Sequence, residues 1–299
     1  LHFTIHSFPT RRSSDLDSFD FVVNTKVSFG VGTRHQLTDV LQSNGWTRIG
    51  VVVDHNVSSI PAVAELLSEL EEELAFVIVG HCEVSEPTYQ DLEAMRDTFT
   101  DEGLHVIVGI GGGSSLDMAK AMAVLATNRE PALTYRGFDQ MTEPVLPVVA
   151  LPTTAGTGSE VTPNASFVDA EEKKKMGING EAVRPRWALL DPELTVSCPQ
   201  KPTVSAAVDS LVHATEAYVA KGTSPLARLL AREGFRKVFN SLSDVVQHPD
   251  DLELRSDVMY GAFLSGIALM NSGTGPAAAL SYPLGVHHDV PHGLGGGIF

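Results

Sequence analysis

Short apolar segments alternate with amphipathic segments through the first two thirds of the chain. Four runs of four or five mostly apolar residues are too short and too evenly apolar for surface helices, so they predict buried strands. These runs are Ile49–Val53, Phe76–Val79, Val106–Ile110 and Val148–Leu151. Hydrophobic residues at three- and four-residue spacing predict helices between the strands. These helices cover Pro61–Glu73, Thr88–Phe99 and Ser114–Ala126.

This alternation of strands and helices is typical of a parallel sheet covered by helices. After Pro199 the strand-type runs stop, and long helical periods follow at Thr203–Ala220, Pro225–Val246 and Leu252–Met270. The pattern therefore predicts an α/β domain over residues 17–192 and an all-α domain over residues 193–299, with the boundary near Asp191. A cleft between two such halves is the expected place for a functional site.

The two ends of the chain depart from this pattern. Residues 1–16, LHFTIHSFPTRRSSDL, have neither the apolar centre of a secretory signal nor a strong period, and we expect them to be a foreign leader outside the fold. The chain stops at Gly295-Gly-Gly-Ile-Phe299, where apolar residues would begin another element. We therefore expect the helical domain to be incomplete at its C-terminus.

Composition narrows the class of partner and compartment. The chain has 21 Lys and Arg against 37 Asp and Glu, a formal charge of −16, which argues against a nucleic-acid or anionic-membrane partner. No apolar run approaches the ~18–20 residues of a membrane span. Cys82 and Cys198 lack metal-type spacing and do not suggest a disulfide framework, so we expect a cytoplasmic protein.

A glycine-rich segment, Gly111-Gly-Gly-Ser-Ser115, connects a predicted strand to a predicted helix. Gly112 and Gly113 would let backbone N–H groups approach a phosphate at the start of the helix, and Ser114 adds a hydroxyl donor. The segment is neither a GxGxxG fingerprint nor a Walker A loop. A tight turn that needs glycine only for its backbone conformation is the alternative.

A second polar loop, Leu151-Pro-Thr-Thr-Ala-Gly-Thr-Gly-Ser-Glu-Val-Thr162, follows another predicted strand. An ordinary surface turn explains this composition equally well. Two such loops at the ends of neighbouring strands, however, lie where open α/β sheets bind ligands. Asp54 ends the first predicted strand, where an acid can accept from ribose hydroxyls and repel a 2′-phosphate, although the residue taken alone favours a turn or capping role.

Candidate metal ligands occur in the helical half. Asp209 and His213 are four residues apart on a predicted helix, so both project from one face and can hold a divalent cation; a simple helical hydrogen bond is the alternative. His287, His288 and His292 lie within six positions of a segment bounded by Gly and Pro, which predicts a loop. Together these histidines favour a metal or substrate role.

The chain resembles the iron-containing (group III) alcohol dehydrogenases. The resemblance is carried, in order and with similar spacing, by GGGSSLDMAKA, LPTTAGTGSEVTP, LLDPEL, AAVDSLVHATEAY and VPHG. It implies the architecture shared with dehydroquinate synthase-like proteins, an N-terminal dinucleotide-binding α/β domain and a helical metal-binding domain. It also implies NAD, a divalent metal (Fe²⁺ ahead of Zn²⁺), a small alcohol or aldehyde substrate, and a homodimer or larger homo-oligomer.

Residue by residue, the resemblance assigns roles to matching positions. Asp54 matches the ribose-recognising acid, and Gly112, Gly113 and Ser114 match the pyrophosphate loop. Thr153, Thr154, Thr157 and Thr162 match the loop near the phosphates and nicotinamide, and Lys175 matches a cofactor-contacting lysine. Asp209, His213 and His292 match three of four metal ligands.

Some positions depart from the family pattern. Ala278 stands where the family has its fourth ligand, a histidine, so His287 or His288 is a candidate to complete the shell. Tyr282 stands where many members have a histidine proposed as a proton carrier, and we take Tyr282 and His288 as candidate catalytic residues. Glu86 replaces the usual cofactor-contacting Asn.

The motifs and the departures from the family pattern are compatible with three functions. The first is an NAD-dependent alcohol dehydrogenase or aldehyde reductase with a metal-polarised substrate. The second is an NAD-binding lyase similar to dehydroquinate synthase, which needs a basic phosphate-binding cluster. The available basic residues are better explained as a solvated helix face: Lys201, Arg228, Arg232, Arg236 and Lys237. The third is a catalytically impaired dinucleotide-binding remnant.

Overall fold

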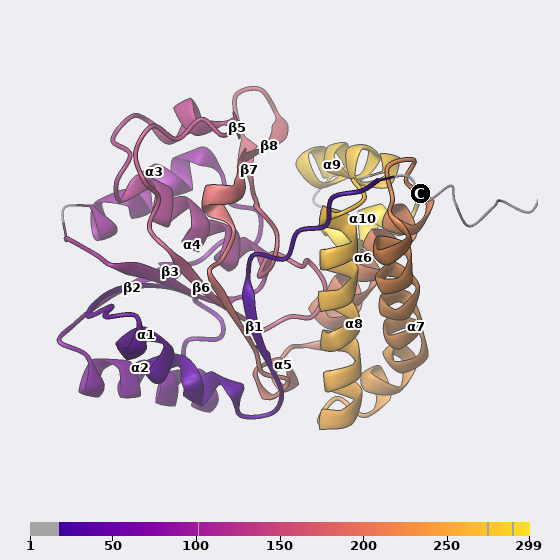
Figure 1. The fold of residues 1–299 in the computed structure, drawn as a ribbon, viewed down its shortest axis with the longest axis horizontal. Helices are drawn as coiled ribbons and strands as arrows, with labels where there is room; N and C mark the ends of the chain where they lie inside the picture. Colours follow the sequence, from indigo (N-terminus) through magenta and orange to yellow (C-terminus); the bar gives the residue numbers. More distant parts are fainter. Residues whose placement is uncertain (1–17, 101, 274, 289) are drawn as a thin grey trace, which may run out of the picture.

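The protein consists of an α/β half and a helical half, as the sequence predicts (Figure 1). The structure is a computed structural model that describes residues 18–100, 102–273, 275–288 and 290–299. The predicted leader, residues 1–16, lies outside the described residues. None of the described helices combines the length and apolarity needed to cross a bilayer.

A six-stranded parallel sheet forms the centre of the α/β half. Its strands, in spatial order, are β1 (Lys26–Phe29), β9 (Trp187–Leu190), β6 (Val148–Pro152), β4 (Val106–Gly111), β2 (Arg48–Asp54) and β3 (Phe76–Cys82). The chain runs outward from β2 to β3 and then returns past β2 to β4, so the strand order reverses between β2 and β4. Ligands of open α/β sheets bind outside the carboxyl ends of strands at such a point.

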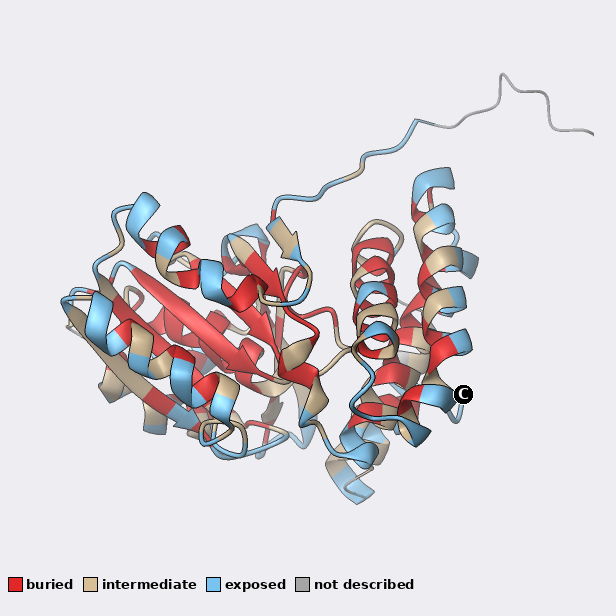
Figure 2. Ribbon diagram, turned by 90° about the horizontal axis from the view of Figure 1, so that it is seen from below, coloured by how far each residue is buried: buried red, intermediate tan, exposed pale blue. Residues whose placement is uncertain are grey.

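Helices cover both faces of this sheet, which explains why its strands are nearly continuous apolar runs. One face carries the 3-10 helix η1 (Thr33–Gln36), α1 (Leu37–Ser43) and α2 (Pro61–Glu73), and the other carries α3 (Tyr89–Phe99) and α4 (Gly113–Leu125). Alternate residues of one strand enter opposite cores: Val51 and Val53 pack toward α1 and α2, whereas Val52 packs toward α3 and α4. In Figure 2 the buried sheet lies between helices whose outer faces are exposed.

A smaller three-stranded sheet, which the hydrophobic pattern does not predict, extends the α/β half toward the helical half. It contains β5 (Gly137–Phe138), β8 (Lys174–Asn179) and β7 (Asn164–Asp169), and β7 pairs with β8 in antiparallel register. Short 3-10 helices, η2 (Ala132–Tyr135) and η3 (Glu181–Val183), and the one-turn α5 (Glu193–Val196) complete this half.

The helical half contains α6 (Gln200–Val219), α7 (Pro225–Gln247), α8 (Leu252–Met270), α9 (Pro276–His288) and α10 (His292–Gly296). The first three match the predicted helices within a few residues. The loop predicted around His287 is wrong, because this residue lies in the last turn of α9. The helix forms despite Pro283 in its interior, where the missing N–H removes one backbone hydrogen bond.

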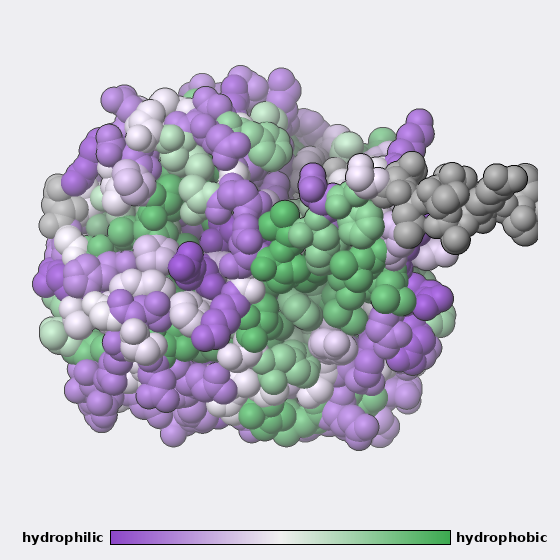
Figure 3. All heavy atoms as spheres, viewed as in Figure 1, coloured by the Kyte–Doolittle hydropathy of each residue, from purple (hydrophilic) through white to green (hydrophobic). Residues whose placement is uncertain are grey.

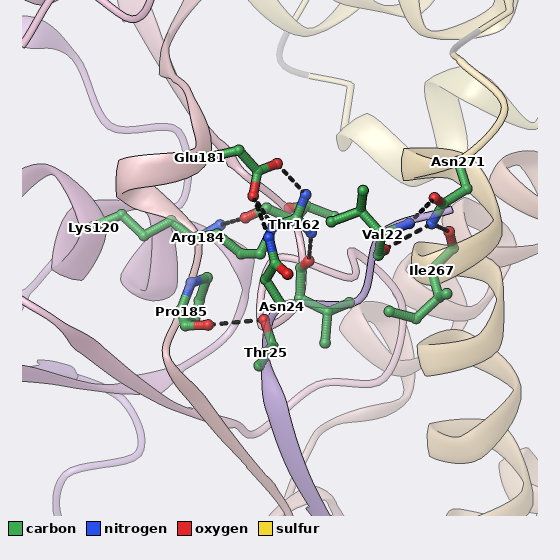
Figure 4. A network of polar contacts seen from close by, with 11 residues as sticks. Val22, Asn24, Thr25, Lys120, Thr162, Glu181, Arg184, Pro185, Ile267 and Asn271 are labelled. Carbon is green, nitrogen blue, oxygen red and sulfur yellow. Dashed lines mark hydrogen bonds and ion pairs between the residues drawn. The ribbon is translucent and has the colours of Figure 1, made fainter. Parts of the chain in front are cut away.

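The segment that precedes β1 crosses from one half to the other (Figure 4). The side chain of Asn271, just after α8, pairs with the backbone of Val22 in both directions: the Val22 N–H donates to Oδ1 at 2.7 Å, and Nδ2 donates to the Val22 carbonyl at 3.0 Å. Asn24 then donates to Glu181, and the Thr25 hydroxyl donates to the Pro185 carbonyl at 2.8 Å. This strap, residues 22–25, fastens the end of α8 to the edge of the α/β half.

Glycines bring the backbones of the two halves into direct contact. A Cβ at Gly156 would lie 2.0 Å from the Ala206 carbonyl oxygen of α6, and a Cβ at Gly158 would lie 2.9 Å from the Gly266 Cα of α8. Only glycine permits this approach, and Gly158 also has a φ of +68°, which favours glycine. The threonine-rich loop after β6 is therefore packed against the helical half.

Candidate functional site

Three neighbouring strands, β2, β4 and β6, deliver candidate residues to one edge of the sheet. β2 ends at Asp54, β4 ends in the glycine turn, and β6 leads into the threonine-rich loop. The loops touch, because the Thr153 N–H donates to the Gly111 carbonyl at 2.9 Å. A Cβ at Gly111, which has a φ of +152°, would lie 2.9 Å from the Asp54 Cβ, so glycine is required beside this acid.

The glycine turn and the threonine-rich loop are packed together at the start of α4. Gly112 is the N-cap residue and Gly113 the first residue of the helix. A Cβ at Gly113 would lie 2.6 Å from the Thr157 Cγ2, so this position also needs glycine. The Ser114 hydroxyl donates to the Ser85 carbonyl, which ties the turn to the loop before α3. The N-terminal N–H groups of α4 thus face the region between the halves.

The structure shows the turn role that the sequence left open for Asp54, and its role toward a ribose stays a prediction. Its Oδ1 accepts hydrogen bonds from the backbone N–H of Asn56 at 2.9 Å and from the Asn56 side chain at 3.2 Å, as in an Asx turn. The residue also lies at the carboxyl end of β2, beside the glycine turn. The turn holds the carboxylate at the edge of the sheet without occupying both of its oxygens.

A cavity of about 220 Å³ lies between the two halves. Nine of the residues predicted from the sequence line it: Gly113, Ser114, Thr157, Thr162, Lys175, Asp209, His213, Tyr282 and His292. Asp54, Gly112, Thr153, Thr154 and His288 are not among its lining residues. The first four remain beside the cavity on the loops just described, whereas His288 is exposed at the end of α9. The structure therefore does not bring His288, a predicted catalytic residue, to the site.

Asp209, His213 and His292 meet at one wall of the cavity. Asp209 Oδ1 lies 3.5 Å from the His213 Nε2 and 3.7 Å from the His292 Nε2, and one donor atom from each residue falls within 4.8 Å of the others. Two imidazoles and one carboxylate form a donor set that suits a divalent transition metal such as Fe²⁺ or Zn²⁺. These residues therefore fit a metal ion.

Helix packing places the three donors. Asp209 and His213 are one turn apart on α6, and α10 brings His292 to them because a Cβ at Gly293 would lie 2.0 Å from the Ser205 carbonyl oxygen. The Ser281 hydroxyl, 3.4 Å from the His292 Nδ1, orients that ring. Burial lowers the pKa of His292, although Asp209 opposes the shift. The neutral imidazole, which is the ligand form, is therefore favoured.

Lys175, on β8, lines the same cavity as Asp209, His213 and His292, which together form the metal-type cluster. Its Nζ pairs with the Glu86 Oε2 at 2.6 Å and lies 5.8 Å from the centre of the Tyr282 ring. The Tyr282 ring in turn lies 5.3 Å from the His292 ring. Burial raises the pKa of Tyr282, with a smaller opposing effect of Lys175, so its hydroxyl stays protonated at neutral pH.

The sequence reasoning missed a polar network that fixes one wall of the cavity. Asp117 accepts hydrogen bonds from the Ser159 hydroxyl at 2.5 Å and from the Ser166 N–H at 2.8 Å. The fully buried Lys120 donates to the Ser159 hydroxyl and to two backbone carbonyls, and burial lowers its pKa to about 8. Asp117 and Lys120 both belong to the motif GGGSSLDMAKA. Their spacing of three residues in a predicted helix, which brings an acid close to a lysine, is the sequence signal that could have identified this network.

The basic residues of the helical half do not build a phosphate site in this cavity. Arg236 pairs with Glu233, Lys237 pairs with Asp257, and Arg228 donates to the Tyr218 carbonyl. None of the five basic residues considered for a lyase lines the cavity. The solvated-face interpretation agrees with these contacts.

Comparisons with known proteins identify the family. The sequence profile of the iron-containing alcohol dehydrogenases matches residues 24–192, and that of the C-terminal domain of the Fe-containing alcohol dehydrogenase family matches residues 203–299. The chain belongs to the iron-containing alcohol dehydrogenase family. The resemblance inferred from the sequence motifs is therefore confirmed.

Individual relatives of this iron-containing alcohol dehydrogenase agree with the assignment. The NAD-dependent methanol dehydrogenase of Bacillus methanolicus is 34% identical over 88% of this chain and 68% of its own length. The long-chain-alcohol dehydrogenase 1 of Geobacillus thermodenitrificans is 35% identical, over 88% of this chain and 67% of its own. The structure of the sulfoacetaldehyde reductase of Bifidobacterium kashiwanohense in complex with NAD⁺ superposes with a TM-score of 0.88, at 28% identity, over 94% of this chain and 75% of that chain.

The substitution Gly293→Ala tests how α10 positions the metal-type cluster. The added methyl group cannot share space with the Ser205 carbonyl oxygen, so α10 must move away from α6 and carry His292 away from Asp209. We expect the affinity for a divalent ion to fall about tenfold or more, measured by titration against a coloured chelator. Gly285→Ala is the matched control, because its Cβ would lie 3.5 Å from the nearest atom, an ordinary contact. Equal affinity in the two variants would contradict the prediction.

Proposed function

We propose that this protein is an NAD-dependent alcohol dehydrogenase or aldehyde reductase. The observation that carries the proposal is the cavity into which one half of the molecule presents phosphate-type loops and the other half presents Asp209, His213 and His292. Its relatives include enzymes described as an NAD-dependent methanol dehydrogenase and a 1,3-propanediol dehydrogenase. Small alcohols and the corresponding aldehydes are therefore the proposed substrates.

The α/β half would hold the cofactor. N–H groups at Gly112, Gly113 and Ser114 are suited to the pyrophosphate, at the positive end of the α4 dipole. Asp54 would accept from the ribose hydroxyls, which favours NAD over NADP. Thr153, Thr154, Thr157 and Thr162 offer hydroxyls on the adjoining loop, and Lys175 approaches from β8. Glu86 already neutralises Lys175, so a bound cofactor must share or replace this ion pair.

The helical half would hold a divalent ion through Asp209, His213 and His292. The bound groups would supply Lewis-acid polarisation of the alcohol or carbonyl oxygen and a nicotinamide that gives or accepts hydride. Tyr282, protonated and packed against His292, is the proposed proton donor or acceptor on this side of the cavity. His288 receives no role, because it lies outside the cavity.

Turnover by the purified chain tests this proposal. We expect NADH-dependent reduction of short aldehydes and NAD-dependent oxidation of primary alcohols, lost after chelation and restored by Fe²⁺ or Zn²⁺. His213→Ala is expected to lower turnover at least about tenfold because it removes a metal donor. His248→Ala, an exposed histidine at the end of α7, is the matched control. Absence of NAD(H) binding in calorimetry would refute the proposal.

A change at Asp54 tests the cofactor assignment separately. Asp54→Ala removes the carboxylate that would repel a 2′-phosphate, so the ratio of NAD to NADP affinity should fall about tenfold. The binding constants of both dinucleotides, measured by fluorescence of the reduced forms, give this ratio. Asp97→Ala, which removes an exposed carboxylate from α3, should leave it unchanged. If the two variants gave the same ratio as the original chain, Asp54 would have no role in ribose recognition.

The protein is also proposed to be a homo-oligomer. β1 is an edge strand of the large sheet, and apolar side chains gather beside it on the surface that Figure 3 shows. Phe29 and Val31 are exposed there, and the Phe29 ring lies 5.3 Å from the ring of Tyr260 on α8. An exposed apolar face along an unpaired edge is typical of a surface that is covered in the assembled protein.

Light scattering coupled to gel filtration tests this proposal. The original chain should give at least the mass of a dimer, and Val31→Glu, which places a charge on the apolar face, should lower that mass. A monomeric mass for the original chain would contradict the proposal.

A further inference from the structure

The face of α6 that carries Asp209 and His213 continues one turn further to Glu216. The three residues are spaced four and then three positions apart, so they project from one side of the helix. All three line the same cavity, together with His292. A second carboxylate is therefore available beside the metal-type cluster.

Glu216 is buried, and only one of its oxygens has a partner. Glu216 is 5% exposed, and its Oε1 accepts a hydrogen bond from the Ala277 N–H at 2.7 Å. Oε2 has no hydrogen-bond partner among the described residues. The chain closes tightly over the carboxylate, because a Cβ at Gly275 would lie 2.7 Å from Oε1. A buried carboxylate oxygen without a donor is costly, so it points to a bound group that the protein atoms alone do not include.

The charges around the cavity indicate what kind of group this is. Lys175 is the basic side chain among the lining residues, and Glu86 already pairs with it at 2.6 Å. Asp117 is paired with the Ser159 hydroxyl and a backbone N–H. Among the described lining residues, Asp209 thus has only the imidazoles of His213 and His292 within ion-pair distance, and Glu216 has no basic partner. A divalent cation supplies the missing positive charge.

We propose that Glu216 is a fourth protein ligand of the divalent ion held by Asp209, His213 and His292. The inference rests on the metal site of the proposed function and adds a donor to it. The three donors within 4.8 Å of one another do not include Glu216, so its side chain must rotate toward them when the ion binds. Two histidines and two carboxylates still leave an octahedral ion such as Fe²⁺ with open positions for substrate.

The alternative role of Glu216 is to anchor the start of α9 through the Ala277 N–H. Glu216→Gln separates the two roles, because the amide oxygen can still accept that hydrogen bond while the amide is a much poorer metal ligand. We expect the affinity for Co²⁺, used as a spectroscopic probe, to fall about tenfold or more. The visible absorption of the Co²⁺ form should also change in intensity, since a lost ligand alters the coordination number. The melting temperature of the metal-free variant should match that of the original chain.

Two further variants complete the experiment. Glu216→Asp keeps a carboxylate on a shorter side chain and should retain more Co²⁺ affinity than Glu216→Gln. Glu65→Gln makes the same chemical change at an exposed carboxylate of α2 that does not line the cavity, and should leave Co²⁺ affinity within about twofold. Co²⁺ affinity and absorption unchanged in both Glu216 variants would overturn the inference. If the original chain itself bound no Co²⁺, the metal site of the proposed function would fail as well.

Discussion

The close approach of two glycines to neighbouring carbonyls of α6 is the constraint on which the site depends. Gly156, from the α/β half, faces the Ala206 carbonyl, and Gly293, from α10, faces the Ser205 carbonyl. Both contacts lie one turn before Asp209. The N-terminal half of α6 is therefore held between the cofactor-type loop on one side and the third metal donor on the other, and a side chain at either glycine would force them apart.

This clamp couples parts of the site that belong to different halves of the molecule. The threonine-rich loop cannot move away from α6 without also disturbing its contacts with the glycine turn and with the buried Lys120. Because cores are close-packed, such a displacement is resisted by the whole interface rather than by one hydrogen bond. Hydride transfer requires cofactor and substrate to be held at a short, fixed separation, and a rigid junction between the halves supplies that geometry.

Much of the fold was predictable because its strongest signals are local. The strands β2, β4 and β6 are buried on both faces, so they stand out as apolar runs, and α2 begins and ends at the predicted residues. The strands β7 and β8 were missed because polar and charged residues interrupt their apolar positions without a regular period, as in Lys174-Lys175-Met176. The helix α9 was missed because Pro283 and Gly285 are typical of loops, whereas packing against α10, β8 and α6 favours the helix.

In the candidate site, likewise, local patterns predicted some residues, whereas the positions of others depend on packing between distant segments. The pairing of Asp209 with His213 follows from helical spacing alone, whereas His292 reaches them through the contact of Gly293 with α6, which no local pattern contains. Glu216 lies at helical spacing from Asp209 and His213, but its burial depends on the closure of Gly275 and Ala277 over it, which the sequence does not show. His288, predicted from the density of histidines, is exposed at the end of α9 and does not line the cavity. The short distance from His288 to His292 along the sequence therefore does not place His288 beside the metal donors.

The strap at residues 22–25 has a consequence for how the molecule is made. Val22 and Asn271 are 249 positions apart, yet their two hydrogen bonds join the beginning of the fold to the end of α8. A ribosome must therefore complete α8 before this early segment can take its final place, while the β2–β4 core can already assemble from nearby sequence. Until then residues 22–25 lack their partner on α8, and β1 lacks its partner strand until β9 has been made. During this interval the nascent chain exposes unpaired strand groups and most needs protection from aggregation.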